Sequence, residues 1–424
     1  MLIKPTKLIM VNVTKNVLLQ TSCFLLKLNY ICMVLKSYKY RLYPNKEQSE
    51  LINKHIGACR FVYNLALEVK NYAYMNQRKS ISCFELMKDL PSLKKECEWL
   101  KEVDSQALQQ SIINLDKAFT QFFKHGAKFP KFKKKSTSTQ SFRSPHPKGI
   151  RLENNKIFLP KFKTGIKIVR ERDFAGEIRS ATVSKTPTGK YFVSILVDNK
   201  KDLPNKKIVE SSTSVGIDLG ISSFIITSDG QKIDNPKYLR NSINRLKVLQ
   251  RRLRNKKKGS ANKKKAYKKI ALIHEKVANQ RKDFLHKLST QLIKNHDTLC
   301  MEYLNISGMV KNHNLALSIS DAGWGMFVEF CKYKAEWSGK NILQIPTFEP
   351  STKICNDCGA INKTLTLANR EWICANCGIE HDRDINAAKV IKKYCLTKYS
   401  PDAIGGEPVE LLTLVRTMKQ ENIL

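Results

Sequence analysis

The order of apolar and polar residues along the chain predicts an alternation of strands and helices. Basic and aromatic residues alternate over residues 36–43, as in a strand, and Pro44 follows. Apolar residues then recur at helical spacing over residues 47–68 and again over residues 105–123. We expect two amphipathic helices there, with their apolar faces in a hydrophobic core.

Short apolar runs separated by turn residues occupy residues 140–198, which predicts a region rich in β structure. The predicted strands are residues 157–159, 166–169, 181–183 and 191–197, and the predicted turns are residues 154–155 and 187–190. A linker at residues 203–207 would follow this region.

A strand pair opens the second half of the chain. Residues 213–221 are mostly apolar but carry one carboxylate, Asp218, between Gly216 and Gly220. Residues 222–230 form the predicted return strand, which ends in an Asp-Gly turn. An unpaired acid inside such a strand is costly, so Asp218 is a candidate functional residue.

The remaining pattern predicts further helices and strands. Two helices joined near Gly259 are expected within residues 245–282, a segment with sixteen Lys or Arg and one acid. Residues 298–304 form a short apolar strand that contains Glu302. The later predictions are a polar loop at 311–322, a helix at 323–338, a strand at 342–345 and a helix at 385–394.

The chain carries a large excess of positive charge. Its 424 residues include 75 Lys and Arg against 37 Asp and Glu, a net charge of +38 with a pI near 9.8. This balance indicates a polyanionic partner, and nucleic acid is the leading candidate. The length and the 42% hydrophobic content favour two or three domains. Twelve cysteines without a dense framework favour a reducing compartment.

Two short segments interleave aromatic rings with lysines. Residues 128–135 have the sequence KFPKFKKK, and residues 161–163, KFK, repeat the pattern. Lysines can hold phosphates while rings stack on bases, so we interpret both segments as nucleic-acid contacts. A solvated basic loop is the alternative interpretation.

The first 32 residues fit the rest of the chain poorly. An apolar run over residues 17–26 is broken by polar residues and is too short for a membrane span. A secretory signal lacks a clear small-residue cleavage site here. We hypothesise that Met33 is the true initiator and that residues 1–35 form an unstructured extension.

Four cysteines have the spacing of a zinc ribbon. Cys355 and Cys358 form one CxxC pair, Cys374 and Cys377 form the other, and fifteen residues separate the pairs. A glycine follows each pair and permits the tight turn of a metal knuckle. We expect a structural Zn²⁺ site, because four sulfur ligands leave no open position. His381 is an alternative ligand, but the four cysteines already satisfy the ion.

Three carboxylates stand in unusual settings: Asp218, Glu302 and an acid at the start of the last predicted helix. That last acid is Asp382 or Asp384, and either could simply cap the helix. Carboxylates on two strands and a helix start can converge at one sheet edge and hold two Mg²⁺ ions about 4 Å apart. Such a metal pair activates water and stabilises the leaving oxygen of a phosphodiester.

Several stretches together resemble a known family, the TnpB (OrfB) proteins of bacterial and archaeal insertion sequences. The matching stretches are residues 39–44, 59–64, 216–220, 318–324 and 333–337, with Glu302 and the whole segment 355–388. They run in family order from about residue 36 to residue 394. The family is similar to the RuvC nucleases and to the type V CRISPR effectors.

The resemblance implies catalytic Asp218, Glu302 and Asp384, with Asp384 chosen over Asp382 because it directly precedes the Ile-Asn-Ala-Ala sequence. It implies an RNA-guided, Mg²⁺-dependent DNA endonuclease encoded by a transposable element. A structured guide RNA transcribed from the element and double-stranded target DNA would be its partners. The implied location is the cytoplasm, associated with the nucleoid and not with a membrane.

The fold implied by the resemblance is α+β and multidomain. An RNase H-like (RuvC) nuclease domain would carry the zinc ribbon as an insertion, and a small N-terminal β-barrel would carry a helical lobe. The expected bounds are 36–44 and 136–203 for the barrel, 45–135 for the lobe, 211–349 and 378–396 for the nuclease, 350–377 for the ribbon, and 397–424 for a tail.

Two other functions compete with the guided nuclease. Transposase chemistry requires strand transfer, and by family comparison the DDE transposases commonly have a closer final acid pair than the widely separated acids here. A catalytically inactive DNA-binding regulator of transposition is the other, and the three intact acids argue against it.

Overall fold

The computed structural model describes residues 34–136, 139–346, 351–366 and 369–399. The chain divides into two compact units, Met1–Asp202 and Leu203–Leu424, here called the N-terminal and C-terminal units. The hypothesis about residues 1–32 and most of the predicted tail fall outside the described residues. No helix in the described part of the chain is long and apolar enough to cross a membrane.

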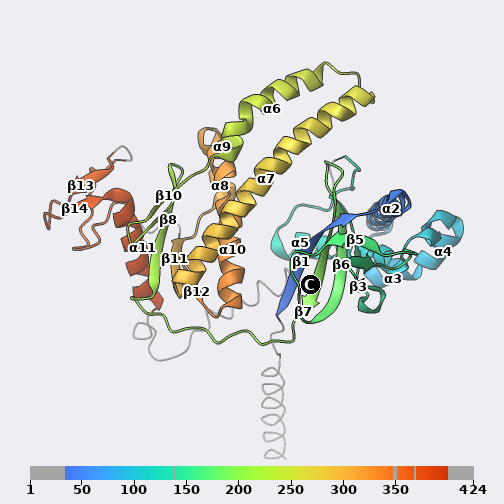
Figure 1. The fold of residues 1–424 in the computed structure, drawn as a ribbon, viewed down its shortest axis with the longest axis horizontal. Helices are drawn as coiled ribbons and strands as arrows, with labels where there is room; N and C mark the ends of the chain where they lie inside the picture. Colours follow the sequence, from blue (N-terminus) through green and yellow to red (C-terminus); the bar gives the residue numbers. More distant parts are fainter. Residues whose placement is uncertain (1–33, 137–138, 347–350, 367–368, 400–424) are drawn as a thin grey trace, which may run out of the picture. The chain divides into compact units, whose positions relative to one another are not determined.

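A seven-stranded antiparallel sheet forms the centre of the N-terminal unit, in the order β2-β6-β7-β1-β5-β4-β3 (Figure 1). The strands are β1 Leu35–Tyr43, β2 Gln140–Ser144, β3 Arg151–Glu153, β4 Lys156–Phe158, β5 Ile166–Val169, β6 Glu177–Lys185 and β7 Tyr191–Asp198. The first strand lies between β7 and β5, although the helices separate it from both along the chain. Every strand predicted in this region is therefore present, whereas closure into a barrel stays a prediction.

Apart from the 3₁₀ helix Pro147–Gly149, the helices of this unit lie between β1 and β2 in the chain. They are α2 Lys46–Gln77, α3 Cys83–Lys88, α4 Leu90–Glu96, the 3₁₀ helix Glu98–Glu102 and α5 Ser105–His125. Asn45 begins α2 through a reciprocal capping box with Gln48. The helix extends nine residues past the predicted end at Glu68, because residues 69–77 contain neither Gly nor Pro.

The core of the N-terminal unit contains a residue that was predicted to contact nucleic acid. Phe162 is buried, and its ring stacks on that of His55 at 5.5 Å between centroids. The prediction that this ring stacks on a base is therefore wrong, because the ring is already used in core packing, whereas phosphate contacts of Lys161 and Lys163 stay a prediction.

A five-stranded mixed sheet forms the centre of the C-terminal unit, in the order β10-β9-β8-β11-β12. Its strands are β8 Ser214–Leu219, β9 Ser223–Thr227, β10 Lys232–Asp234, β11 Thr298–Glu302 and β12 Asn341–Ile345. Strands β8, β11 and β12 run parallel, and β9 and β10 pair antiparallel with their neighbours. The carboxyl ends of β8 and β11 therefore lie at the same edge of the sheet.

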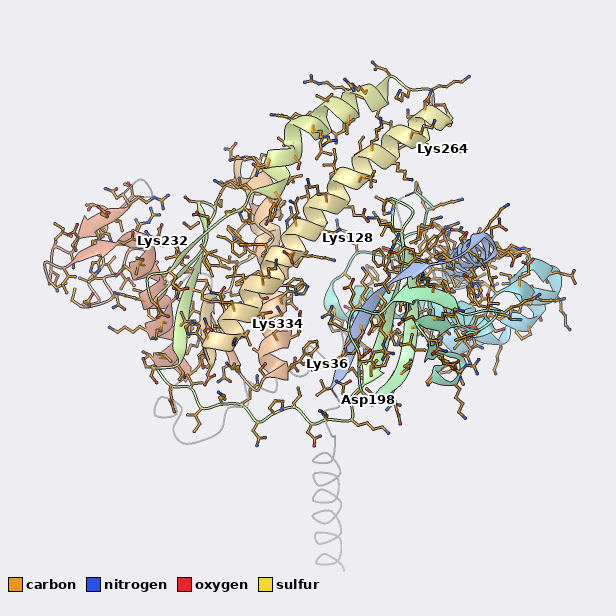
Figure 2. The ribbon with its side chains drawn as sticks, in the orientation of Figure 1. Lys36, Lys128, Asp198, Lys232, Lys264 and Lys334 are labelled. Carbon is orange, nitrogen blue, oxygen red and sulfur yellow. The ribbon has the colours of Figure 1, made fainter. Side chains whose placement is uncertain are left out.

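Two long basic helices, α6 Tyr238–Arg254 and α7 Ala261–Asn295, form the predicted hairpin, which extends away from the sheet (Figure 1). Lys264 lies near the outer end of α7 (Figure 2). The apolar residues Leu285, Leu288 and Leu292 of α7 are buried in the core beside the sheet.

The loop predicted at residues 311–322 is helical instead. The segment holds α9 His313–Ala322, preceded by α8 Ile306–Met309 and followed by α10 Trp324–Trp337. The side chain of Asn312 caps α9 by accepting a hydrogen bond from the Asn314 N–H at 3.1 Å. Gly323, with a φ of 74°, ends it. The prediction failed because the segment is polar and because its two capping residues, Asn312 and Gly323, are of types that are also common in loops.

Helix α11 Arg383–Tyr399 packs on the sheet across β8 and is longer than the predicted 385–394. Gly216 permits this packing, because a Cβ atom at that position would lie 2.0 Å from the carbonyl oxygen of Ala388. Cys300 of β11 and Ile391 of α11 share a small buried cluster. The small ribbon of β13 Glu371–Ile373 and β14 Glu380–Asp382 precedes α11.

Candidate functional site

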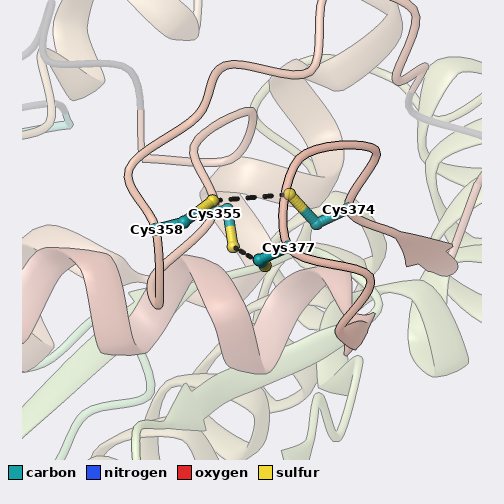
Figure 3. A group of neighbouring side chains, drawn as sticks. All are labelled: Cys355, Cys358, Cys374 and Cys377. Carbon is teal, nitrogen blue, oxygen red and sulfur yellow. Dashed lines mark hydrogen bonds between the residues drawn. The ribbon is translucent and has the colours of Figure 1, made fainter.

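The four predicted zinc cysteines come together in the ribbon. Their sulfur atoms all lie within 4.8 Å of one another (Figure 3). The sulfur atoms of Cys355 and Cys377 are 3.7 Å apart, and those of Cys358 and Cys374 are 3.6 Å apart. A tetrahedron with Zn–S bonds of about 2.3 Å has sulfur–sulfur edges of about 3.8 Å, so the cluster could hold zinc.

Two similar turns position these sulfurs. The Gly359 N–H donates to the Cys355 carbonyl at 2.9 Å, and the Gly378 N–H donates to the Cys374 carbonyl at 2.8 Å. Both glycines have a positive φ, 75° and 72°, which residues with a side chain rarely adopt. The glycine that follows each CxxC pair therefore has the role that the sequence indicated.

His381 lies against the cysteine cluster. Its Nε2 is 3.1 Å from the Cys355 sulfur and 3.8 Å from a carboxylate oxygen of Asp357, and these three side chains form a second group able to hold a metal. The imidazole is buried and packs beside Trp372. With its proton on Nε2, His381 donates to a cysteine sulfur and supports the cluster from outside.

Asp218 and Glu302 lie on neighbouring parallel strands. Ile217 of β8 pairs with Met301 of β11, so the two acids follow at adjacent positions at the carboxyl ends of the strands. The Glu302 carboxylate accepts a hydrogen bond from the hydroxyl of Ser351. The two strand acids therefore stand side by side at one edge of the sheet, as predicted.

The structure separates the two acids at the start of α11. The Asp382 carboxylate accepts from the N–H groups of Asp384 and Ile385, both at 3.0 Å, and so caps the helix. Asp384 is thereby free of the capping role. Its carboxylate instead accepts from Arg383 at 2.6 Å and from Arg370 at 2.7 Å.

Electrostatics link Asp218 to both other acids. Desolvation, together with the charges of Glu302 and Asp384, raises the pKa of Asp218 to about 7, while the Arg383 guanidinium acts in the opposite direction. Burial away from water is the larger cause of this shift, and repulsion by the two neighbouring carboxylates adds to it. A bound cation would relieve this repulsion.

The three acids are near one another but do not form a closed set of ligands. Among the described residues, the only groups whose ligand atoms all lie within 4.8 Å involve the ribbon cysteines, so the carboxylates are more widely spaced. The structure thus brings the acids to one region and leaves their oxygens apart.

A cavity of about 560 Å³ adjoins Asp218 and Asp384. Four basic residues line it as well: Lys237, Arg240, Arg370 and Arg383. The acids that line it can hold cations, and the guanidinium groups that line it can bind phosphate. This combination suits chemistry on a phosphodiester.

Two polar residues that position the site were given no role from the sequence. Asp321 accepts from the N–H groups of Leu239 and Arg240, at 2.9 and 3.0 Å, and so fixes the start of α6 at the cavity. Asn386 accepts from the Asn356 N–H at 2.9 Å and donates to the Ile354 carbonyl at 2.6 Å. Both are buried, and both lie in segments that resemble the family, residues 318–324 and 355–388.

Asn386 connects the cysteine cluster to the carboxylates. Its two hydrogen bonds hold the backbone on both sides of Cys355, while its own backbone lies in the first turn of α11, two residues after Asp384. The first knuckle of the ribbon and the helix start are therefore fastened together by one side chain.

Three sequence profiles of known families match parts of the chain. Residues 194–313 match the OrfB_IS605 family, described as "Probable transposase", and residues 324–391 match "Cas12f1-like, TNB domain". Residues 33–79 match a profile described as "Helix-turn-helix domain". The structure has strand β1 and the single helix α2 in that last range.

Relatives match most of the chain. A protein of Streptomyces pristinaespiralis named "Putative RNA-guided DNA endonuclease" is 37% identical over 84% of this chain and 89% of its own length. InsQ of Escherichia coli K12, named in the same way, is 33% identical over 84% of this chain and 91% of its own length. A Cas12f1 chain, solved by cryo-EM with single guide RNA and target DNA, has a similar fold, with a TM-score of 0.59 at 12% identity over 85% of this chain and 99% of that one.

Proposed function

Because this chain belongs to the OrfB (TnpB) family of insertion-sequence proteins, we propose that it is an RNA-guided DNA endonuclease with its catalytic acids at Asp218, Glu302 and Asp384. The sequence prediction of the family is confirmed. Two relatives that carry the name of RNA-guided DNA endonuclease cover over four-fifths of the chain and support the activity.

The observation that carries the site assignment is geometric: Asp218 and Glu302 follow paired residues at the carboxyl ends of β8 and β11, and Asp218 and Asp384 line one cavity. The pKa of Asp218, raised by desolvation and by the charges of Glu302 and Asp384, supports the assignment. Elements far apart in the sequence, β8, β11 and α11, supply these three acids. Carboxylate oxygens are the ligands that Mg²⁺ prefers, so the donor set fits this ion. Bound Mg²⁺ would supply an activated water and stabilise the leaving oxygen of the phosphodiester.

The arginines of the site have their own part in the proposal. Arg370 and Arg383 neutralise Asp384 when no cation does so, and their guanidinium groups line the same cavity. If a cation were bound to Asp384, these groups would be available to bind the phosphate oxygens of DNA in the cavity. On binding of the cation and DNA, each arginine would thus exchange the Asp384 carboxylate for a phosphate oxygen.

Zn²⁺ in the proposed function is structural. Cys355, Cys358, Cys374 and Cys377 would hold it and leave no position for water, which fits the sulfur spacing in the ribbon. His381 would remain outside the ligand set, as a donor to Cys355.

The finer architecture follows from the same proposal. The C-terminal unit would be an RNase H-like (RuvC) domain with the ribbon inserted before α11, and the N-terminal sheet would be a small barrel carrying a helical lobe. The expected domain bounds given above are part of this proposal. Guide RNA and double-stranded target DNA would be the partners, in the cytoplasm at the nucleoid, in keeping with the net charge of +38.

Reconstitution with guide RNA tests this function. The purified ribonucleoprotein with Mg²⁺ is expected to cleave duplex DNA that matches the guide, and Asp218→Ala or Asp384→Ala is expected to abolish cleavage while target binding persists. Asp283→Ala is the control, because this acid is exposed on α7. If both site variants cut like the wild-type protein, the assignment of the acids is wrong.

Transposase activity is the second candidate, favoured by the description "Probable transposase" of the matching family. It predicts joining of DNA ends by the protein without RNA. A strand-joining assay run with and without guide RNA separates the two, since RNA-independent joining would support the transposase.

A further inference from the structure

Helix α5 carries its apolar stripe beyond the core of the N-terminal unit. Leu108, Ile112 and Leu115 are fully buried, whereas Phe123, two turns further on, is 75% exposed. The helix then ends at Gly126, whose φ of 65° reverses the chain. Exposed apolar area of this kind on a folded helix indicates a partner.

The chain that returns from Gly126 completes a group of four rings. Phe129 makes edge-to-face contacts with Phe119 and Phe122, at 5.5 and 5.3 Å between centroids, and Phe123 packs on both of them. Phe129 is itself 46% exposed. These four residues are here called the phenylalanine platform.

The loop that carries Phe129 is fastened at its far end. Asn64 of α2 accepts from the Lys133 N–H at 2.7 Å and donates to the Lys133 carbonyl at 3.0 Å. The Lys133 ammonium lies 3.8 Å from the centre of the Tyr63 ring. The platform is therefore held before any partner arrives, which lowers the entropy cost of binding.

The segment that carries the platform is rich in lysine. Residues 117–135 contain seven lysines and no acid, and Lys128 of this segment is marked in Figure 2. Lys124, Lys128 and Lys131 are exposed. Protein interfaces are depleted of lysine, so a polyanion fits this surface better than a second protein does.

We propose that the phenylalanine platform stacks an unpaired nucleobase while the adjacent lysines hold the flanking phosphates. The base must be unpaired, because duplex bases already have their faces covered by neighbours. This inference rests on the proposed function, which requires RNA and opened DNA, and it adds the residues and the chemistry of one contact. RNA and DNA single strands share that chemistry.

Binding of labelled oligonucleotides to the full-length chain, freed of nucleic acid and kept in chelator, tests the proposal. The probes are a 20-mer of deoxythymidine, a 20-mer of uridine and an abasic 20-mer with the same phosphates. Phe123→Ala is expected to weaken binding of a base-bearing probe by about 5- to 100-fold, the usual effect of losing one stacked base. Binding of the abasic strand should be unchanged.

Two further variants control for folding and for shape. Phe84→Ala removes a ring of α3 that is 74% exposed but lies outside the lysine segment, and it should leave all affinities unchanged. Phe123→Leu keeps an apolar side chain without a ring face and should behave like Phe123→Ala. Phe123→Trp should keep the affinity, and the emission of its indole should be quenched by the base-bearing strands alone.

Equal affinity of Phe123→Ala and wild-type protein for both base-bearing probes would overturn the proposal. An equal loss for the abasic strand would overturn it too, since the effect would then be electrostatic. A change in the sedimentation of Phe123→Ala without oligonucleotide would instead show that the platform contacts a second copy of the chain. A change in its thermal stability would show that the platform serves packing within the chain. Because no guide RNA or metal is present, failure of cleavage leaves this test unaffected. The base-bearing probe that loses more affinity in Phe123→Ala shows whether the platform prefers single-stranded DNA or RNA.

Discussion

The cysteine cluster and the carboxylate group differ in how far apart their members lie in the sequence. Cys355 and Cys377 are 22 residues apart, and short turns bring the sulfurs within 4.8 Å of one another. Asp218 and Asp384 come from the first strand and the last described helix of the C-terminal unit, and with Glu302 they do not form a group whose oxygens all lie within 4.8 Å of one another. Local turns set up the first site, whereas the second depends on the packing of a whole unit.

The difference extends to what neutralises each group. Backbone N–H groups and His381 contact the sulfurs, and Asn386 of α11 holds the backbone beside Cys355. Arginines from two segments neutralise Asp384, while the pKa of Asp218 is raised to about 7. Repulsion among the carboxylates therefore remains, and a bound cation would reduce it. The following variants test this contrast, from the largest expected effect to the smallest.

Loss of one ribbon sulfur should have the largest effect. Cys355→Ser is expected to release zinc and to cost more than about 3 kcal/mol of stability, because metal binding contributes directly to folding. Metal analysis and thermal unfolding would measure both. Cys97→Ser, outside the cluster, is the control. Retained zinc with unchanged stability would refute the structural role.

In the absence of divalent cations, removal of the Asp218 charge should stabilise the protein. The folded pKa of Asp218, about 7, lies above its unfolded value, so the folded state binds the extra proton between about pH 4 and pH 7. Stability from this group falls as the pH rises through that window. Asp218→Asn should therefore gain up to about 4 kcal/mol at pH 8 and less at pH 5.

Urea denaturation of both proteins in chelator at the two pH values gives this difference, and Mg²⁺ should reduce it. A stability difference that is the same at pH 5 and pH 8 would show that Asp218 does not titrate in this range.

Removal of the Asn386 side chain, which connects the cysteine cluster to the start of α11, should have a smaller effect. Asn386→Ala leaves the Ile354 carbonyl and the Asn356 N–H without their partner, at a cost of about 1–3 kcal/mol. Zinc content should be retained, whereas Mg²⁺ affinity should fall because the start of α11 shifts. Metal analysis and Mg²⁺ titration separate the two, with Asn295→Ala at the exposed end of α7 as control. Unchanged Mg²⁺ affinity would mean that the ribbon does not position Asp384.

The smallest stability change is expected at Arg370. Its ion pair with Asp384 is half exposed on the arginine side, so Arg370→Ala should change stability by less than about 1 kcal/mol. Divalent-cation affinity should rise instead, because Asp384 loses a competitor. Calorimetric titration with Mg²⁺ measures this, and a lower affinity would contradict the competition.

Much of the fold could be predicted from local pattern. The CxxC spacing predicted the sulfur cluster, the alternation of basic and aromatic residues predicted β1, and the apolar runs predicted β8, β11 and β12, because each of these signals is contained in a short stretch of sequence. The residues 311–322 were missed because Asn312 and Gly323, which begin and end α9, resemble ordinary loop residues in sequence.

The site itself was less accessible to such reasoning. Asp382 and Asp384 could not be distinguished by pattern alone, since only the hydrogen bonds to Asp382 identify it as the cap. Phe162 has the same lysine neighbours as Phe132, but one ring is buried and the other is 50% exposed. Asp321 and Asn386 act through contacts that cross between segments, which no single stretch of sequence contains.

The contact between Gly216 and the Ala388 carbonyl has a consequence for how the protein is made. A ribosome synthesises β8 well before α11, so the strand must wait through the translation of more than 150 residues for the helix that covers it. A nascent chain that stalls in the ribbon would carry Asp218 and Glu302 without Asp384. If the three acids are catalytic, as proposed, such a truncated product should be unable to cut the chromosome of the cell that makes it.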